Sequence, residues 1–401
     1  MRFPRFLAVR NCRKRSSRSF ALGLVAGVLS LVLFGGSLMI ISLQNGLAQF
    51  KERLGADIIV LPREAQQQGR LEGVLVQGIP ANFYMEDSCL AVLRRMPGVE
   101  RATPQFFLAS ANSECCSVPV QIIGFDPATD FTIQPWIHES FSGSVGQGDI
   151  LVGSGISVHH DRMIKFYNIP CRVVGRLNPT GTGMDTAVYT DMDTIRTMMK
   201  NATDLNFDYF KDVPAERAIS AVLLKTAEGF SPEAMAEAIN QEYPQLTAKP
   251  AHGMISSVGQ GLGGITGTIG VLLFMVWLLS AIILVVAFRM VVNERRREFA
   301  ILLVAGATRG MLVRIVLLES LLVCAIGAAI GIFAGSAVIL PFAGMIKTSL
   351  ARPYLLPDAV SILLLAAGAF FVTVVSGALS AAWTVRLVAD SDVGMILRED
   401  G

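Results

Sequence analysis

Residues 293–310 read NERRREFAILLVAGATRG and lie between two long apolar runs. On a helix, Glu294 and Glu298 are four positions apart, and arginines of the triplet between them lie three positions from a glutamate, close enough for side-chain pairing. Gly306 predicts the end of this helix, and Thr308 can cap the next one. An ordinary basic loop needs only a few arginines. The added glutamates and the apolar face therefore predict an amphipathic helix that serves as a docking surface.

The rest of the sequence predicts a membrane protein with four spans. The 401 residues are 52% hydrophobic and 16% charged, whereas soluble domains carry about 25% charged residues. A helix needs about 20 apolar residues to cross a bilayer core. Four runs are long enough, with Arg314 and Glu319 as the only charges inside them: residues 20–43, 261–288, 311–346 and 359–385. The first run exceeds the roughly 7–15 apolar residues of a signal peptide, so we interpret it as a retained span.

The charge distribution predicts the orientation of these spans. Residues 1–18 hold seven basic side chains and no acidic one, and six basic residues lie between Arg289 and Arg314. Basic residues favour the cytoplasmic side of a membrane, and four spans place both chain ends on one side. We expect three cytoplasmic segments and one outer loop: residues 1–19, a coupling helix at 289–310, a tail at 386–401, and the loop at 347–358. The mildly acidic tail opposes this orientation. No basic stripe of the kind that binds nucleic acid is expected.

Residues 44–260 predict a globular extracytoplasmic domain, with 17 basic and 24 acidic residues. Strand-like runs alternate with helical ones, which indicates an α+β domain. The strands are expected at residues 58–61, 118–123, 150–152, 171–174 and 221–224, and the helices at residues 87–96, 192–200 and 232–242. We expect two packed parts that divide near Gly148. The predicted fold class is an α-helical membrane protein with four transmembrane helices and a large extracytoplasmic α+β domain.

Glycines recur every four positions in two of the spans, at Gly23 and Gly27 in the first and at Gly327, Gly331 and Gly335 in the third. Such spacing lets helices approach each other closely. The pattern is compatible with packing within one chain and with a dimer seam, and it does not decide between them.

Glu319 is an ionisable residue inside the third span. It lies about 11 residues past Thr308, which is about 16 Å along a helix. A charge at that depth is costly and is usually partnered. Arg314 points to a different face, so a partner is expected from another span. The alternative is a glutamate near the interface that extends to water.

The sequence lacks the common nucleotide-binding and catalytic motifs. No G-x-x-x-x-G-K-[ST] occurs, so the chain has no P-loop for ATP phosphates. Gly259, Gly261 and Gly264 satisfy G-x-G-x-x-G, but they lead into an apolar run, so we interpret them as a hinge or helix entry. G-x-S-x-G, H-E-x-x-H and C-x-x-C are also absent. We expect no enzyme activity in this chain by itself.

The stretch NERRREFAILLVAGATRGMLVRIVLLESLLVCAIGAAIG resembles the signature of FtsX/MacB-type (type VII) ABC transporter permeases. It has the charged start, the short helix, the G-A-[ST] turn and a span with L-E-[SA] and glycines. The four-span layout and LGADIIVLP after the first span extend the resemblance over essentially the whole chain. The ending, RLVADSDVGMILRED, lacks the usual D-P. The resemblance implies a MacB-like periplasmic core domain in a bacterial inner-membrane protein.

In this family two permeases pair with two cytoplasmic ATPase subunits, which bind ATP and Mg²⁺. The resemblance therefore implies an ATPase dimer and a second permease as partners. It also implies that a set of residues forms the coupling helix that receives the ATPase stroke: Glu294, Arg295, Arg296, Arg297, Glu298 and Gly306.

Four cysteines fall in the outer domain: Cys89, Cys115, Cys116 and Cys171. Extracytoplasmic cysteines usually form disulfides, and one arrangement pairs Cys89 with Cys171 and Cys115 with one of the others. The adjacent Cys115 and Cys116 can instead form a strained redox-active ring or offer two soft ligands to a metal. His159 and His160 are too few for a metal site, which needs three or four ligands, and are expected in a solvated turn.

Residues 115–136 also resemble a branch of these permeases associated with bacterial iron-acquisition systems. This resemblance implies that the outer domain handles iron, haem or electrons for metal reduction, with copper as a further metal to test at the cysteines. Phe131 and Trp136 would suit a partner-binding surface if exposed and would belong to the core if buried.

Three functions remain open at this level. The first is the membrane subunit of an ABC transporter, whose outer domain is moved by mechanical transmission because few polar residues line the spans. Its cargo is then a metal or redox-linked partner, or a peptide, lipoprotein or drug. The second is a signalling or scaffold protein that activates an extracytoplasmic partner. The third is a membrane redox protein without an ATPase.

Overall fold

The computed structural model describes residues 16–389, apart from residues 68–69, 111–115, 142, 159–161, 206, 208–212, 296–300, 302–303, 305, 307 and 351–352. The described residues form two compact units. The membrane unit takes its residues from the ranges 16–41, 264–344 and 357–389. The outer unit takes its residues from the ranges 42–263 and 345–356.

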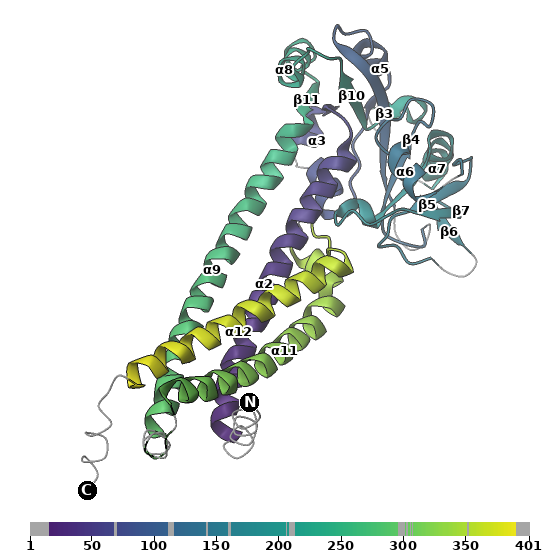
Figure 1. Cartoon of the computed structure of the whole chain (residues 1–401). Coiled ribbons are helices and arrows are strands. Elements are labelled where there is room, and N and C mark those ends of the chain that lie inside the picture. The colour runs from purple at the N-terminus through teal and green to yellow at the C-terminus, as the bar shows by residue number, and fades with distance from the viewer. Residues whose placement is uncertain are drawn as a thin grey trace. The chain divides into compact units, whose positions relative to one another are not determined.

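Four long helices carry the apolar runs: α2 (Ser16–Leu54), α9 (Ala251–Glu294), α11 (Arg309–Leu350) and α12 (Ala359–Ala389) (Figure 1). Each is long and apolar enough to cross a membrane, judged by length and composition. The helices α2 and α9 extend well beyond the predicted spans. The glycine-rich stretch from Gly259 to Gly264 lies inside α9, where it is continuous helix and not a break.

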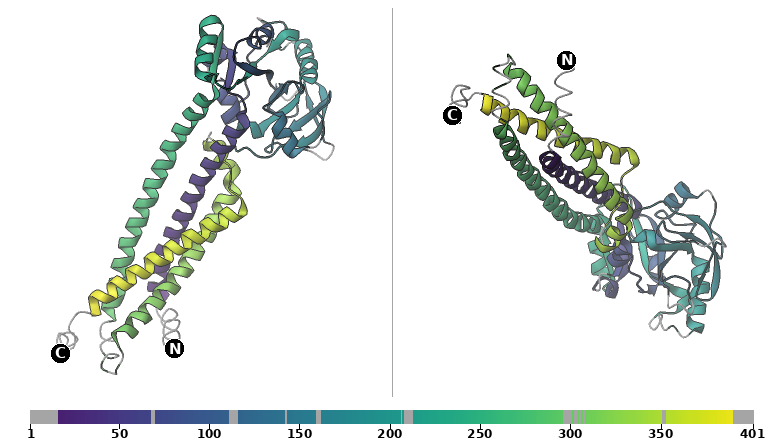
Figure 2. Two further views of the ribbon diagram at one scale, coloured as in Figure 1. Left: turned by 45° about the horizontal axis from the view of Figure 1, so that its top comes forward. Right: turned by 90° about the horizontal axis from the view of Figure 1, so that it is seen from below.

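Close backbone contact joins α2 to α11 in the membrane unit, as can be followed in Figure 2. A Cβ added to Gly331 would collide with the carbonyl oxygen of Gly27, and a Cβ added to Gly327 would collide with that of Gly23. Only glycine permits such an approach, and this is the geometry that small residues allow in membranes. These glycines therefore serve packing within the chain.

Polar side chains tie α12 to two other helices of the membrane unit. The indole Nε1 of Trp277 on α9 donates to Oγ of Ser376 at 3.1 Å. The hydroxyl of Ser320 on α11 donates to the carbonyl oxygen of Gly377 at 3.0 Å. The membrane unit also contains an apolar cluster with side chains from all four helices, including Leu22, Ala26, Leu284, Phe288, Leu312, Val316, Ala381 and Val385.

A nine-stranded sheet forms the centre of the outer unit, in the order β11-β1-β10-β3-β4-β8-β5-β7-β6. Neighbours are antiparallel except for the pairs β4–β8 and β5–β7. The strands are β1 (Ile58–Pro62), β3 (Val99–Ala109), β4 (Gln121–Phe125), β5 (Asp149–Val152), β6 (Met163–Phe166), β7 (Ile169–Arg176), β8 (Ala187–Asp191), β10 (Ala221–Thr226) and β11 (Leu246–Pro250). A separate pair consists of β2 (Met85–Glu86) and β9 (Ala218–Ile219).

The longer helices of the outer unit are α5 (Ser88–Leu93), α6 (Gln134–Ser140), α7 (Met192–Asp204) and α8 (Pro232–Glu242). Local sequence explains where two of them begin. The Asp191 carboxylate accepts from the backbone N–H of Thr194 at the start of α7, and Ser231 caps α8 ahead of Pro232, as helix-start preferences predict. Short helical turns complete the unit: α3 (Arg63–Gln67), α4 (Arg70–Glu72), η1 (Gly73–Gln77), η2 (Gly183–Thr186) and η3 (Ala215–Arg217).

Two hydrophobic cores lie along the sheet. One contains Phe106, Ile150, Phe166, Val188 and Met198, and the other contains Ile58, Leu93, Val222, Ile239 and Leu246. The expected division near Gly148 is wrong. The second core combines β1 with β10 and β11 from the opposite end of the domain sequence, because β1 pairs with both of these strands.

Candidate functional sites

The predicted coupling helix, residues 289–310, is called the coupling segment below, and its first six residues, up to Glu294, belong to α9 instead of starting a separate helix. Glu294 is the last residue of α9, and Arg295 comes directly after it. Gly306 has a φ of +92°, a left-handed conformation typical of the residue that ends a helix. Thr308 caps α11 as predicted, because its Oγ1 accepts from the N–H of Met311 at 3.3 Å. The predicted coupling residues Arg296, Arg297 and Glu298 lie outside the described residues.

Arg295 is paired with the glutamate inside the third span. Its Nη1 lies 2.8 Å from Oε2 of Glu319, with side-chain exposures of 8% and 18%. A charge in such a poorly solvated place is stabilised only when an opposite charge and a hydrogen bond compensate it. Glu319 therefore has a partner, but not from another span as expected: Arg295 follows α9 and belongs to the predicted coupling helix.

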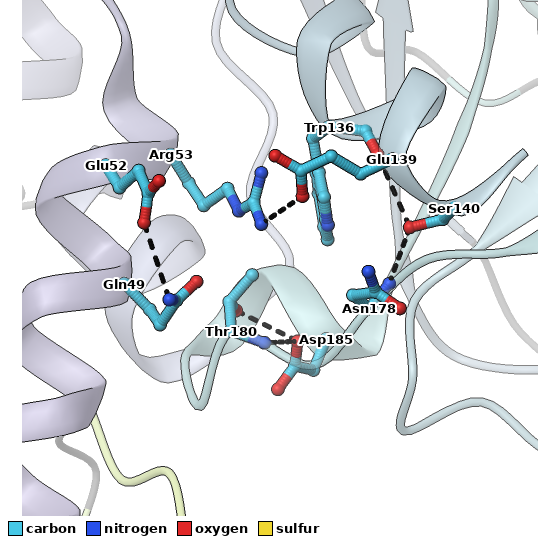
Figure 3. A network of polar contacts seen from close by, with 9 residues as sticks. All are labelled: Gln49, Glu52, Arg53, Trp136, Glu139, Ser140, Asn178, Thr180 and Asp185. Atoms are coloured by element: carbon cyan, nitrogen blue, oxygen red, sulfur yellow. Dashed lines mark hydrogen bonds and ion pairs between the residues drawn. The ribbon is translucent and has the colours of Figure 1, made fainter.

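A second ion pair, with one buried and one exposed partner, joins α2 to α6 within the outer unit. Arg53 lies in the last turn of α2, and its Nη2 donates to Oε2 of Glu139 on α6 at 2.6 Å (Figure 3). The guanidinium also stands 5.7 Å from the ring centroid of Trp136, within cation–π range. The hydrogen bond from Arg53 lowers the pKa of the Glu139 carboxyl from its ordinary value, so the pair stays charged at neutral pH.

Trp136 belongs to the core and not to a partner surface. It is 1% exposed, and its ring meets that of Tyr189 edge to face with centroids 5.2 Å apart. Phe131 is half-buried beside the Arg101 guanidinium, 4.8 Å from the ring centroid. The Asp130 carboxylate accepts from the N–H groups of Ile133 and Gln134 and so holds the start of α6 in place. The Asp130 hydrogen bonds thus help to position α6, which carries Glu139, the partner of Arg53.

The outer cysteines do not form the expected disulfide. Cys89 and Cys171 are free thiols that pack in different cores, so the pairing of these two is wrong. Burial raises the pKa of the Cys89 thiol to about 11 and that of Cys171 to about 12. Cys116 is 3% exposed in the same core as Cys171, and Cys115 lies outside the described residues.

The histidines add no ligand cluster within the described part of the chain. His138 and His252 are exposed, whereas His159 and His160 are not described. Nowhere in the described ranges do three His, Cys, Asp or Glu side chains come together as a metal site.

Sequence reasoning did not identify Arg53 and Glu139. They are 86 positions apart and belong to no short motif, so only the folded chain brings them together. The one signal in the sequence was a basic residue in the last turn of a long helix, where cations are favoured.

Two sequence-family models match the chain. The model described as MacB-like periplasmic core domain matches residues 20–242. The model described as FtsX-like permease C-terminal matches residues 270–387. A search of the curated proteins finds no match.

Several solved structures are similar at low sequence identity. The periplasmic region of MacB from Actinobacillus actinomycetemcomitans is 8% identical with a TM-score of 0.31, covering 51% of this chain and 94% of that one. The extracellular domain of the noncanonic ABC-type transporter YknZ from Gram-positive bacteria is 10% identical with a TM-score of 0.27, covering 48% and 98%. A domain of a permease protein from Porphyromonas gingivalis is 14% identical with a TM-score of 0.26, covering 49% and 91%.

Proposed function

The chain belongs to the family of ABC-transporter permeases that join a MacB-like periplasmic core domain to an FtsX-like membrane part, and on that premise we propose that it couples ATP hydrolysis by a separate cytoplasmic ATPase to movements of its outer domain. The proposed location is a bacterial inner membrane, with both chain ends in the cytoplasm. The proposed partners are an ATPase dimer and a second permease, either identical or homologous.

The observation that carries this proposal is the ion pair between Arg295 and Glu319. The pair joins Arg295, which follows α9, to Glu319 on α11. A force on the coupling segment is therefore carried by both helices and does not only bend the chain at the end of α9. The same helix α9 continues without a break to Ala251, directly after β11 of the outer unit. A continuous helix is a rigid element suited to carry a displacement along its length.

Mechanical transmission fits the membrane unit better than a polar pore. Apolar side chains from all four helices pack together inside the membrane unit. The buried hydroxyl of Ser320 donates to a carbonyl oxygen of α12, and those of Ser380 and Thr384 donate to carbonyl oxygens one turn earlier in α12 itself. We therefore propose that the outer domain handles the cargo outside the membrane.

The proposed cargo is iron, haem or a metal- or redox-linked partner protein, with Cys115 and Cys116 as contacts. This part of the proposal rests on the sequence alone. The test is a titration of the full chain in detergent with haem, iron or copper under oxidising and reducing conditions. Binding that is lost in Cys115→Ser/Cys116→Ser and retained in Cys89→Ser would support this class. Equal binding by all variants, or none, would direct the search to peptide or lipid cargo.

The test of the coupling function is a charge reversal. Arg295, Arg296 and Arg297 are replaced by glutamate in the full chain, and Arg289→Glu, at an exposed position of α9, is the matched control. We expect the triple variant to lose co-purification of a P-loop ATPase and to lose cargo handling, whereas the control keeps both. Unchanged ATPase binding and cargo handling in the triple variant would overturn the proposal. Retained ATPase binding with no cargo moved by wild type would favour the signalling alternative.

A further inference from the structure

Residues 353–356, here called the outer strap, lie between α11 and α12 in the sequence and belong to the outer unit. The N–H of Tyr354 donates to the carbonyl oxygen of Gly181 at 2.7 Å, and the N–H of Leu355 donates to that of Ser42 at 2.9 Å. Tyr354 is 4% exposed. The strap is therefore held on one side by the turn before η2 and on the other by the α2 helix.

Two glycines make these bonds geometrically accessible. A Cβ on Gly46 would stand 2.5 Å from the carbonyl carbon of Pro353 and 2.6 Å from the nitrogen of Tyr354. Gly46 lies one turn after Ser42 on the same helix face. The absence of a side chain there lets the strap reach the Ser42 carbonyl. A Cβ on Gly181 would likewise stand 2.5 Å from the carbonyl oxygen of Tyr354.

The turn that receives the strap is rigidly built. The buried Asp185 carboxylate accepts from the N–H and the hydroxyl of Thr180, at 2.7 and 2.9 Å, and from the N–H of Gly181 at 2.8 Å. The hydroxyls of Thr180 and Thr182 lie 2.8 Å apart in the same network. Satisfied buried networks of this kind rigidify the backbone that they hold. A displacement of the strap is therefore passed to this part of the outer unit instead of being absorbed by the turn.

We propose that the outer strap is a second mechanical connection, by which the third and fourth spans act on the outer domain in parallel with α9. This inference rests on the proposed coupling function and adds a route to it. The chain itself supplies the connection, because the strap is covalently continuous with both spans. Strap bonds to Ser42 and Gly181 would make α2, the strap and the η2 turn move together.

The test uses two pairs of glycine variants in the full chain. Gly46→Ala places a methyl group against the strap backbone, whereas Gly253→Ala adds one to α9 where nothing lies within 4 Å. Gly181→Ala, at a φ of +75°, collides with Tyr354, whereas Gly229→Ala, at a φ of +89°, has the same backbone strain and open space. Each control thus adds the same methyl group in the same type of backbone, helical in the first pair and left-handed in the second.

Two measurements decide the outcome, and both are made on the chain in complex with the ATPase that co-purifies with it. Hydrogen exchange measures how fast the backbone amides of Tyr354 and Leu355 exchange, and so whether their hydrogen bonds to Gly181 and Ser42 are broken. Spin labels at Lys200→Cys and Leu379→Cys, both exposed positions, measure the ATP-driven change in distance between α7 and α12. We expect Gly46→Ala and Gly181→Ala to exchange these amides at least about tenfold faster and to lose most of the ATP-driven distance change. Both controls should behave as wild type.

Three other results would each overturn one of the two proposals. Released amides with an unchanged ATP-driven distance change would overturn the strap proposal and leave the coupling function intact. Amides that exchange as in wild type in both clashing variants would also overturn it, because the strap would not be held where the bonds place it. The absence of any ATP-driven change in wild type would overturn the coupling function itself.

Discussion

Nη1 of Arg295 donates a hydrogen bond to Oε2 of Glu319 across 2.8 Å. The two residues stand 24 positions apart, one directly after α9 and the other on α11. The pair explains why a glutamate is tolerated inside a span, and it joins the residue directly after α9 to α11. Removing either partner would leave the other charge poorly solvated.

Glu319→Ala is expected to destabilise the chain through this unpaired charge. Breaking a buried pair by removing one partner costs about 3–5 kcal/mol, and the partial exposure of Glu319 favours the lower end of this range. Thermal unfolding of the full chain in lipid nanodiscs measures the effect. Arg314→Ala is the control, since it removes an exposed charge from the same helix. Equal melting temperatures for the two variants would contradict a structural ion pair.

The pair of Arg53 and Glu139 predicts a pH-dependent contribution to stability. The pKa of Glu139 is lowered in the folded chain from its ordinary value of 4.5. The contribution is therefore fully present above that value and is lost as the pH falls through the lower folded value. Because Glu139 is 48% exposed, we expect no more than about 1 kcal/mol. Wild type should melt above Glu139→Gln at pH 7, and the difference should vanish in acid. A difference that grows in acid would contradict the assignment.

Cys89 and Cys171 are expected to react slowly with thiol reagents. Their pKa values of about 11 and about 12 leave almost no thiolate at pH 8, and the thiolate is the reactive form. Labelling of the native full chain with iodoacetamide, read by mass spectrometry, should modify these two cysteines only after denaturant is added. Rapid labelling of Cys171 in the native chain would show that its core is open to solvent.

Substitution of glycine by alanine is expected to destabilise the chain at the contact between α2 and α11 and to be tolerated at an open position of α9. Gly331→Ala places a methyl group against the carbonyl oxygen of Gly27 and should lower the unfolding temperature, because backbone must move. Gly267→Ala in α9 meets nothing within 4 Å and should be neutral or stabilising by up to about 1 kcal/mol. A neutral Gly331→Ala would mean that the two spans are not in backbone contact.

Local patterns in the sequence predicted the elements well. Long apolar runs gave the four helices, and the strands expected at residues 58–61, 150–152, 171–174 and 221–224 are present. The remaining expected strand begins later, at Gln121. The helix start at Pro232 and the cap at Thr308 follow from preferences that act over a few residues. Such preferences depend on residues that are close in the sequence, so a single sequence is enough to recognise them.

Long-range relationships were not predictable in the same way. The pairing of β1 with β10 and β11 brings together the two ends of the outer domain, and alternation of apolar residues does not specify the partner of a strand. The burial of Trp136 depends on Tyr189, which comes from a different element. The ion pairs of Arg53 and Arg295 likewise join positions with no common motif.

The most direct test of the central claim is a charge swap in the ion pair of Arg295 and Glu319, which joins the residue after α9 to α11. The ATP-driven distance change between labels at Lys200 and Leu379 is measured in the full complex for Arg295→Glu, Glu319→Arg and the double variant. We predict that each single reversal reduces the ATP-driven change by about tenfold and that the double variant restores a large part of it. Single variants that fold, bind the ATPase and move the outer domain as wild type does would contradict the account.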